Sequence, residues 1–154
     1  MNTNEEILNA LSERLRDIIK KYTNINNWEG LEEIRAREGR PLMVIRNSHD
    51  IMLTDKGTAT LDAKRAYAVS HEDILETMEL ISESSIYAFE DELRNGYITL
   101  RGGHRVGLAG RVVLERGVIK TLRDITCLNI RVTRQLKGIS EKVMGYVFRP
   151  PHGV

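Results

Sequence analysis

The chain of 154 residues has little of what several classes of protein require. Its single cysteine, Cys127, cannot form an internal disulfide, so nothing points to an oxidising compartment and a cytoplasmic location is expected. No stretch reaches the roughly 18 apolar residues that a membrane-spanning helix needs. The amino-terminal segment also lacks the basic and then apolar pattern of a signal peptide. We therefore expect a protein that is neither exported by a signal peptide nor membrane-spanning.

Sequence motifs for catalysis are equally scarce. The phosphate-binding loop G-x-x-x-x-G-K-[ST], the dinucleotide motif G-x-G-x-x-G and the nucleophile elbow G-x-S-x-G do not occur in the sequence. The four histidines show no metal-ligand spacing, and the apolar pattern around Cys127 favours core packing over a catalytic thiol. We predict no catalytic residue, no metal site and no cofactor in this chain.

Charge is present but unevenly distributed along the chain. The net charge is only +1, yet residues 1–100 hold 12 basic and 19 acidic side chains, a net charge of −7, whereas residues 101–154 hold 11 and 3, a net charge of +8. Such an asymmetry predicts an anionic partner at the basic end: nucleotide phosphate, nucleic acid or an acidic protein face. The alternative is a sheet face on which arginines are simply solvated.

The spacing of apolar residues predicts an α+β fold. We expect an N-terminal helix, a small antiparallel sheet, a helical hairpin and a C-terminal antiparallel sheet, in that order. The expected helices run from Thr3 or Asn4 to Tyr22, from Ser70 through Ile81, from Ser84 or Ser85 to Gly96, and for a short stretch after Ser140. The expected strands cover residues 33–37, 42–46, 51–53, 66–69, 97–100, 104–114, 118–122 and 125–133.

The most distinctive segment is YITLRGGHRVGLAGR at residues 97–111, in which four glycines and three arginines share fifteen positions. Because side chains alternate along a strand, Arg105, Gly107, Ala109 and Arg111 are predicted to share one face. Two arginines flanking two small residues suit a planar anion that accepts bidentate hydrogen bonds, such as phosphate. A later strand adds Arg131 and Arg134, whose odd separation points only one of them the same way.

The glycines of this segment predict special backbone positions. A turn is expected at Gly102 and Gly103. Glycine within a strand costs stability, so Gly107 and Gly110 are expected to mark a bulge or a close approach of another backbone or a ligand. All four are therefore candidate backbone-approach positions.

Three segments of the chain resemble a known family. SIYAFEDELRNGYITLRGGHRVGLAGRVV, with EIRAREGRPL before it and LRDITCLNIRVTRQLKG after it, resembles stage III sporulation protein AA of endospore-forming bacteria over most of residues 29–140. That family is similar to the secretion-type AAA+ ATPases of pilus retraction and of type II and type IV secretion. The resemblance implies a PAS-like domain at residues 29–136, preceded by an N-terminal helix and linker at 1–28. Residues 137–154 would form a linker helix leading to a RecA-like ATPase core that this chain lacks.

The resemblance also implies a function. The chain would be the non-catalytic N-terminal regulatory and oligomerisation domain of a sporulation ATPase that powers or assembles the secretion channel between mother cell and forespore. The parent protein would bind ATP and Mg²⁺ and form a hexamer. Its partners would be its own RecA-like core, other copies of the chain and membrane proteins of the channel, on the mother-cell side and peripheral to the membrane.

Site residues follow from the same resemblance. The family's R-x-R-V strand, and a later strand with an arginine near its middle, match Arg105 and Arg131, which are expected to contact nucleotide phosphate or a subunit interface. Arg111 and Arg134 are further candidates. His104 stands where an arginine is common, and Arg35 stands at the histidine of a D-[IL]-H-x-x-x-G-x-P motif. Solvation or salt bridges within the domain remain the alternative for these arginines.

Two other function classes stay open at this point. A nucleic-acid-binding module would use the basic sheet, but no aromatic residue interleaves with the arginines of residues 101–134 to stack on bases. No nucleic-acid partner is therefore expected. A protein-interaction domain would instead dock its acidic helices, including the one at residues 85–95, on a membrane protein.

Overall fold

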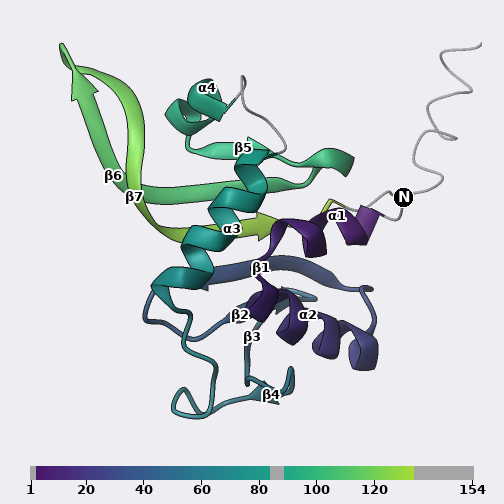
Figure 1. Ribbon diagram of the computed structural model, residues 1–154. Coiled ribbons are helices and arrows are strands. Elements are labelled where there is room, and N and C mark those ends of the chain that lie inside the picture. Colours follow the sequence, from purple (N-terminus) through teal and green to yellow (C-terminus); the bar gives the residue numbers. More distant parts are fainter. Residues whose placement is uncertain (1–2, 84–88, 134–154) are drawn as a thin grey trace, which may run out of the picture.

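A seven-stranded antiparallel sheet with helices on one side forms the molecule (Figure 1). The computed structural model describes residues 3–83 and 89–133. Within them the strand order is β4-β3-β2-β1-β7-β6-β5. The elements are α1 (Thr3–Ala10), α2 (Glu13–Asn26), β1 (Leu31–Arg37), β2 (Met43–Arg46), β3 (His49–Leu53), β4 (Ala59–Thr60), α3 (His71–Glu83), α4 (Phe89–Asn95), β5 (Tyr97–Thr99), the 3₁₀ turn η1 (Arg101–Gly103), β6 (Arg105–Glu115) and β7 (Val118–Arg131). The predicted α+β class is confirmed.

The N-terminal helix differs from the prediction, because two helices replace the one expected from Thr3 to Tyr22. Ser12 adopts an extended ψ of 154° and caps α2, its hydroxyl accepting a hydrogen bond from the Leu15 amide. The Ser12 amide in turn donates to Thr77 Oγ1 at 2.9 Å, a contact to α3 that the sequence pattern does not reveal. The break lets α1 and α2 follow different parts of the twisted sheet while the same apolar face stays buried.

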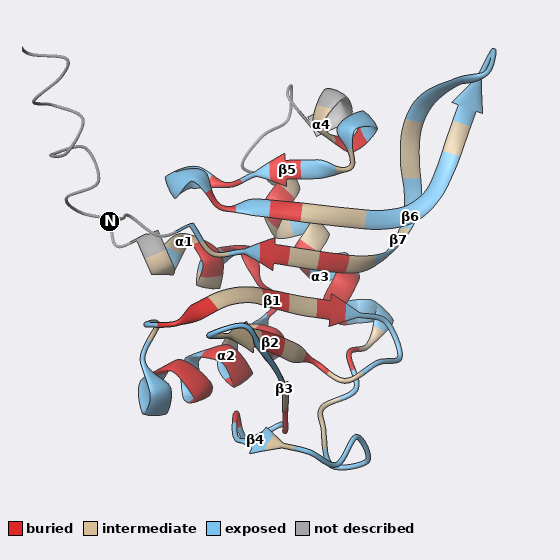
Figure 2. Cartoon of the chain, turned by 180° about the vertical axis from the view of Figure 1, so that it is seen from behind, coloured by how far each residue is buried: buried red, intermediate tan, exposed pale blue. Residues whose placement is uncertain are grey.

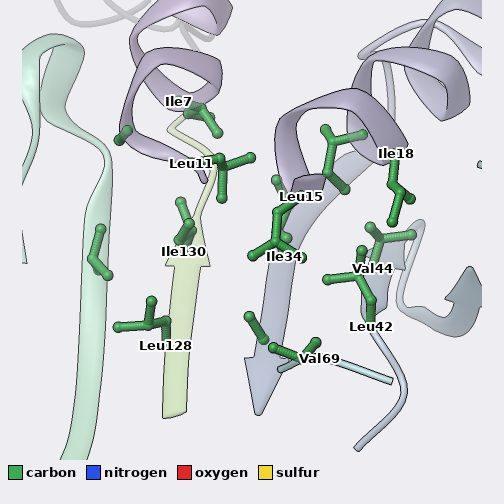
Figure 3. Packing of buried hydrophobic residues seen from close by; sticks show 14 of the residues in the cluster. Ile7, Leu11, Leu15, Ile18, Ile34, Leu42, Val44, Val69, Leu128 and Ile130 are labelled. Carbon is green, nitrogen blue, oxygen red and sulfur yellow. The ribbon is translucent and has the colours of Figure 1, made fainter. Parts of the chain in front are cut away.

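The hydrophobic core lies between the helices and one face of the sheet (Figure 3). Ile7 comes from α1, Leu11 directly follows that helix, and Leu15 and Ile18 come from α2. All four are at most 1% exposed. They pack over inward-facing side chains of the central strands. These strand side chains include Leu31, Ile34, Val44, Val106, Leu128 and Ile130.

A buried carboxylate joins α2 to α3. Asp73, only 4% exposed, accepts hydrogen bonds from the Ser12 hydroxyl at 3.1 Å and the Tyr67 hydroxyl at 2.7 Å. The amide and hydroxyl of Ser70 donate to the same side chain. Asp73 thus lies at the N-termini of both helices, where the helix dipoles favour its negative charge.

The prediction of two separate sheets is wrong, since β1 pairs with β7 and merges them into one. The register runs from Glu33 opposite Arg131 to Arg37 opposite Cys127. Unpaired strand edges leave backbone donors and acceptors without partners, and joining the two halves removes one edge from each. The pairing lies between segments far apart in sequence, which explains why periodicity did not indicate it.

Three strand boundaries also need correction. The turn before β3 takes only Asn47 and Ser48, both with positive φ, so β3 starts at His49. The strand predicted at residues 66–69 is a single bridge between Pro41 and Ala68. The segments predicted at 118–122 and 125–133 form one strand, β7, whose pairing is irregular opposite Ala109–Arg111 rather than interrupted.

Some predictions fall outside the described residues. These are the start of a helix at Ser84 or Ser85, the short helix after Ser140 and the linker helix at 137–154. None of the helices in the described part of the chain has the length and hydrophobicity of a membrane span.

Strands β6 and β7 continue beyond the rest of the sheet as a two-stranded ribbon (Figure 2). Strand β5 pairs with β6 only as far as Gly107, and β1 pairs with β7 only as far as Cys127. Beyond these points β6 and β7 pair with each other, ending at Glu115 opposite Val118. We call residues 110–124 the arm.

Candidate anion site on the open face of the sheet

The sheet has one face covered by helices and one that carries polar side chains. Helices α1, α2 and α3 lie in front of the sheet in Figure 1 and behind it in Figure 2. We call the opposite side the open face. Alternation places Ile130, Leu128 and Val106 on the helix side, where all three are fully buried. Their neighbours along the strands therefore lie on the open face.

Arg105 and Arg131 lie directly opposite each other on the open face. They are register partners in the antiparallel pairing of β6 with β7, and such partners have Cβ atoms about 5 Å apart. Both residues are exposed. The strand pairing thus brings together the two arginines that the sequence singled out.

Arg105 stacks on an aromatic ring. Its guanidinium carbon lies 5.3 Å from the centre of the Tyr97 ring, within the range of a cation–π contact. Tyr97, Arg105 and Arg131 line a shallow hollow whose remaining walls are Gly107 and Asn129. None of the acidic side chains in the described residues forms an ion pair with Arg105.

Arg131 borders a chain of charges that runs towards β3. Its Nε lies 3.7 Å from Glu33 Oε2, a long contact, whereas Glu33 Oε1 accepts a hydrogen bond from Arg35 Nε at 2.7 Å. Arg35 also reaches Asp50 at 3.6 Å. The hydrogen bond with Glu33 raises the pKa of Arg35, since it favours the charged guanidinium. Glu33 therefore interacts mainly with Arg35, and the guanidinium of Arg131 is only weakly paired and can still bind an anion.

His104 has a structural role beside this site. It is fully buried, and its Nδ1 accepts a hydrogen bond from the Thr133 amide at 3.0 Å. The neighbouring Gly103 carbonyl accepts one from the Thr133 hydroxyl at 2.6 Å. Gly102 and Gly103 both have positive φ, near 80°, which suits glycine. This turn ties the start of β6 to the end of β7 and holds Arg105 in register with Arg131.

The other candidate residues have different surroundings. Gly107 lines the hollow, and a Cβ there would meet Asn129 only at an ordinary 3.8 Å. At Gly110, by contrast, a Cβ would lie 2.6 Å from the Arg123 carbonyl oxygen, so the backbone of β7 approaches closely there. Arg111 forms an ion pair with Asp124 on the arm. Arg134 lies outside the described residues.

The arrangement suits binding of an anion by two guanidinium groups. Like charges directly opposite each other in a sheet are destabilising, and an oxyanion between them would relieve the repulsion while accepting several hydrogen bonds. Among the described residues, no group of three or more His, Cys, Asp or Glu side chains could hold a metal ion. The sequence did not indicate Tyr97 as a member of the site, because its position depends on the register of β5 with β6.

Comparison with known proteins gives the chain a family. The family model described as "Sporulation stage III, protein AA" matches residues 1–151. Stage III sporulation protein AA of Bacillus subtilis (strain 168) is 39% identical over 144 residues, which cover 94% of this chain and 43% of the relative. The chain thus spans less than half of that relative's length.

A solved structure shows a weaker likeness. The VirB11 ATPase of the Brucella suis type IV secretion system, crystallised with sulphate, has a TM-score of 0.38 and 13% identity, covering 86% of this chain and 37% of that one. A TM-score this low carries no conclusion about the fold. The match to the family model over nearly the whole chain is decisive, and the chain belongs to the sporulation stage III protein AA family.

Proposed function

We propose that this chain is a non-catalytic, PAS-like domain of a sporulation ATPase, in which Arg105 and Arg131 contact the phosphate of a nucleotide held by an ATPase core outside the chain. The observation that carries the proposal is the direct opposition of the two arginines on the open face. Family membership and the shorter length relative to the curated relative support a partner domain in the same protein.

The site has the chemistry for contact but not for tight capture. Both arginines are exposed on a sheet rather than enclosed in a cleft, so water competes for their hydrogen bonds. A phosphate presented by another domain would accept hydrogen bonds from two guanidinium groups and would lose little of its own hydration. Arg105 and Arg131 would then report the nucleotide state of the core and couple it to domain movement, which makes the domain regulatory.

The wider role follows from the family. We propose that the parent ATPase binds ATP and Mg²⁺, works as a hexamer, and powers or assembles the channel between mother cell and forespore. It would lie on the mother-cell side, peripheral to the membrane, and dock with channel membrane proteins. The sequence G-x-x-x-x-G-K-[ST] is expected within about twenty residues after Val154 in the parent protein.

Binding of inorganic pyrophosphate to this chain tests the site directly. In a ¹⁵N NMR titration, the amides of Gly107 and Asn129 should shift at millimolar pyrophosphate, because these residues line the hollow between the arginines. The double variant Arg105→Gln/Arg131→Gln should lose the shifts. The matched control Arg116→Gln/Arg123→Gln removes two exposed arginines of the arm and should keep them.

Three outcomes would contradict the proposal. Shifts that persist in the Arg105→Gln/Arg131→Gln variant would place the anion elsewhere. ATP hydrolysis by the chain above the level of that variant would show catalysis in this domain. Binding of single-stranded DNA or RNA that falls steeply with salt concentration would favour the nucleic-acid alternative.

A further inference from the structure

Glu33 lies beside the arginine pair on the open face of the sheet. Strands β1, β7 and β6 run next to one another across this face (Figure 2). Arg131 on β7 is the register partner of Glu33 on β1 and of Arg105 on β6, and register partners share a face. Arg131 therefore has a carboxylate on one side and a second guanidinium on the other.

The carboxylate of Glu33 is held in place by its surroundings. The Glu33 side chain is only 12% exposed, whereas that of Arg131 is 77% exposed. Glu33 Oε1 accepts the hydrogen bond from Arg35 Nε at 2.7 Å, and Arg35 also reaches Asp50. Glu33 Oε2 lies 3.7 Å from Arg131 Nε. A movement of Glu33 away from Arg131 would break the short hydrogen bond with Arg35, so the negative charge stays where it is.

This fixed negative charge acts on any anion in the hollow between the arginines. An oxyanion that Arg105 and Arg131 bind together has to lie next to Arg131, and therefore near Glu33. The carboxylate repels that oxyanion and competes with it for the donors of Arg131. Because the site is exposed to water, the repulsion is moderate, on the order of a three- to tenfold loss of affinity at low ionic strength.

We propose that Glu33 sets the anion affinity of this site and keeps it low. The inference rests on the proposed phosphate contact of Arg105 and Arg131. Free phosphate or nucleotide in solution then occupies the hollow only at high concentration. A phosphate held by an attached core has a roughly millimolar effective concentration, which favours binding in spite of the carboxylate. Glu33 thus lets the site distinguish a phosphate presented by the core from the same anion free in solution.

Pyrophosphate titrations of the wild-type chain and of Glu33→Gln test this role. Followed by the ¹⁵N NMR shifts of Gly107 and Asn129, which line the hollow, the dissociation constant should fall about three- to tenfold in the variant at low ionic strength. Glutamine keeps an oxygen that can accept the hydrogen bond from Arg35, so the fold should be retained. Circular dichroism and thermal unfolding check this. Glu33→Thr, which suits a strand, is a second uncharged variant.

The matched control is Asp50→Asn. It removes one negative charge, as Glu33→Gln does, but β1 and β2 lie between the strand of Asp50 and that of Arg131. The dissociation constant of this control should therefore differ less than about twofold from the wild-type value. Salt distinguishes charge from shape, because the advantage of Glu33→Gln should shrink as NaCl is raised from about 0.02 M to about 0.2 M. An advantage that arises from altered structure would not depend on salt.

The outcomes separate this inference from the phosphate contact itself. If the wild type binds pyrophosphate between the arginines and Glu33→Gln binds it equally or more weakly, the phosphate contact stands and the role of Glu33 is overturned. An equal gain in Asp50→Asn, or a gain that does not depend on salt, would overturn that role as well. If neither the wild type nor Glu33→Gln shows shifts at Gly107 and Asn129, the phosphate contact is wrong and the role of Glu33 falls with it.

Discussion

Two arginines that face each other across neighbouring strands repel, and Arg105 and Arg131 form such a pair. The cost of like charges in this position is about 0.2–1 kcal/mol. The cation–π contact between Arg105 and Tyr97 offsets part of it. A pair that costs stability and faces solvent is better explained by ligand contact than by folding.

Neutralising Arg131 should therefore not harm the fold. We expect Arg131→Gln to leave the free energy of unfolding unchanged, or to raise it by up to about 0.5 kcal/mol at low ionic strength. The long contact with Glu33 that it loses is worth little at an exposed arginine. Urea unfolding at low and high salt measures this. A loss above about 1.5 kcal/mol would mean that Arg131 serves the fold instead.

Tyr67 makes the free energy of unfolding depend on pH in the alkaline range. Burial and the hydrogen bond to Asp73 raise the pKa of Tyr67 from 10.0 to about 12. Because the folded state holds this proton more tightly than the unfolded state, the contribution is fully present below pH 10 and is lost as pH rises towards 12. Unfolding free energies measured across this window should fall more steeply for the wild type than for Tyr67→Phe. Equal slopes would contradict the assignment.

At the scale of elements, the junction between the sheet and the arm depends on Gly110. The β6–β7 pairing is irregular there, and Asp124 opposite it has a φ of 47°. A side chain at Gly110 would press on backbone oxygens of β7, with Arg123 O at 2.6 Å and Asp124 O at 3.0 Å. Backbone atoms cannot move aside as the end of a flexible side chain can.

Substitution by alanine should affect stability differently at the two strand glycines, Gly110 and Gly107. Gly110→Ala is expected to lower the free energy of unfolding by about 1–3 kcal/mol, because the β7 backbone must shift. Gly107→Ala is the matched control and should cost less than about 1 kcal/mol, since its Cβ meets Asn129 O only at 3.8 Å. Amide exchange along the arm should accelerate in the first variant alone. Similar losses in both variants would show that β7 is not tightly placed at Gly110.

At the scale of the whole molecule, the β1–β7 pairing makes one cooperative unit of two strand groups. Trp28, the single tryptophan, packs against the core near β1. Leu128 belongs to the other strand group and is fully buried. Both residues depend on one core, so disturbance of either strand group should reach the other.

Leu128→Ala tests this cooperativity. The variant should lose about 2–5 kcal/mol, and its unfolding curves from Trp28 fluorescence and far-UV circular dichroism should move together and coincide. A fluorescence transition that stays at the wild-type position while the dichroism transition shifts would show that the two strand groups unfold separately.

Features that depend on neighbours in the chain could be predicted from the sequence, whereas features that depend on distant residues could not. Local patterns identified β1, α3 and β6, because period-two and helical spacing depend on neighbours in the chain. They missed the break at Ser12, since the partners that hold it, Asp73 and Thr77, lie about sixty residues away. They also missed the pairing of β1 with β7, because these strands lie far apart in the sequence.

The sequence by itself determined the α+β class and the charge asymmetry, and its resemblance to a known family selected Arg105 and Arg131 as the arginines to examine. Only the tertiary structure decided that these two lie opposite each other, that Tyr97 stacks on Arg105, and that apolar side chains of the arm such as Leu114 stay exposed. The physical reason is that alternation sets which face a side chain occupies, whereas the register between distant strands is set by burial of the whole core.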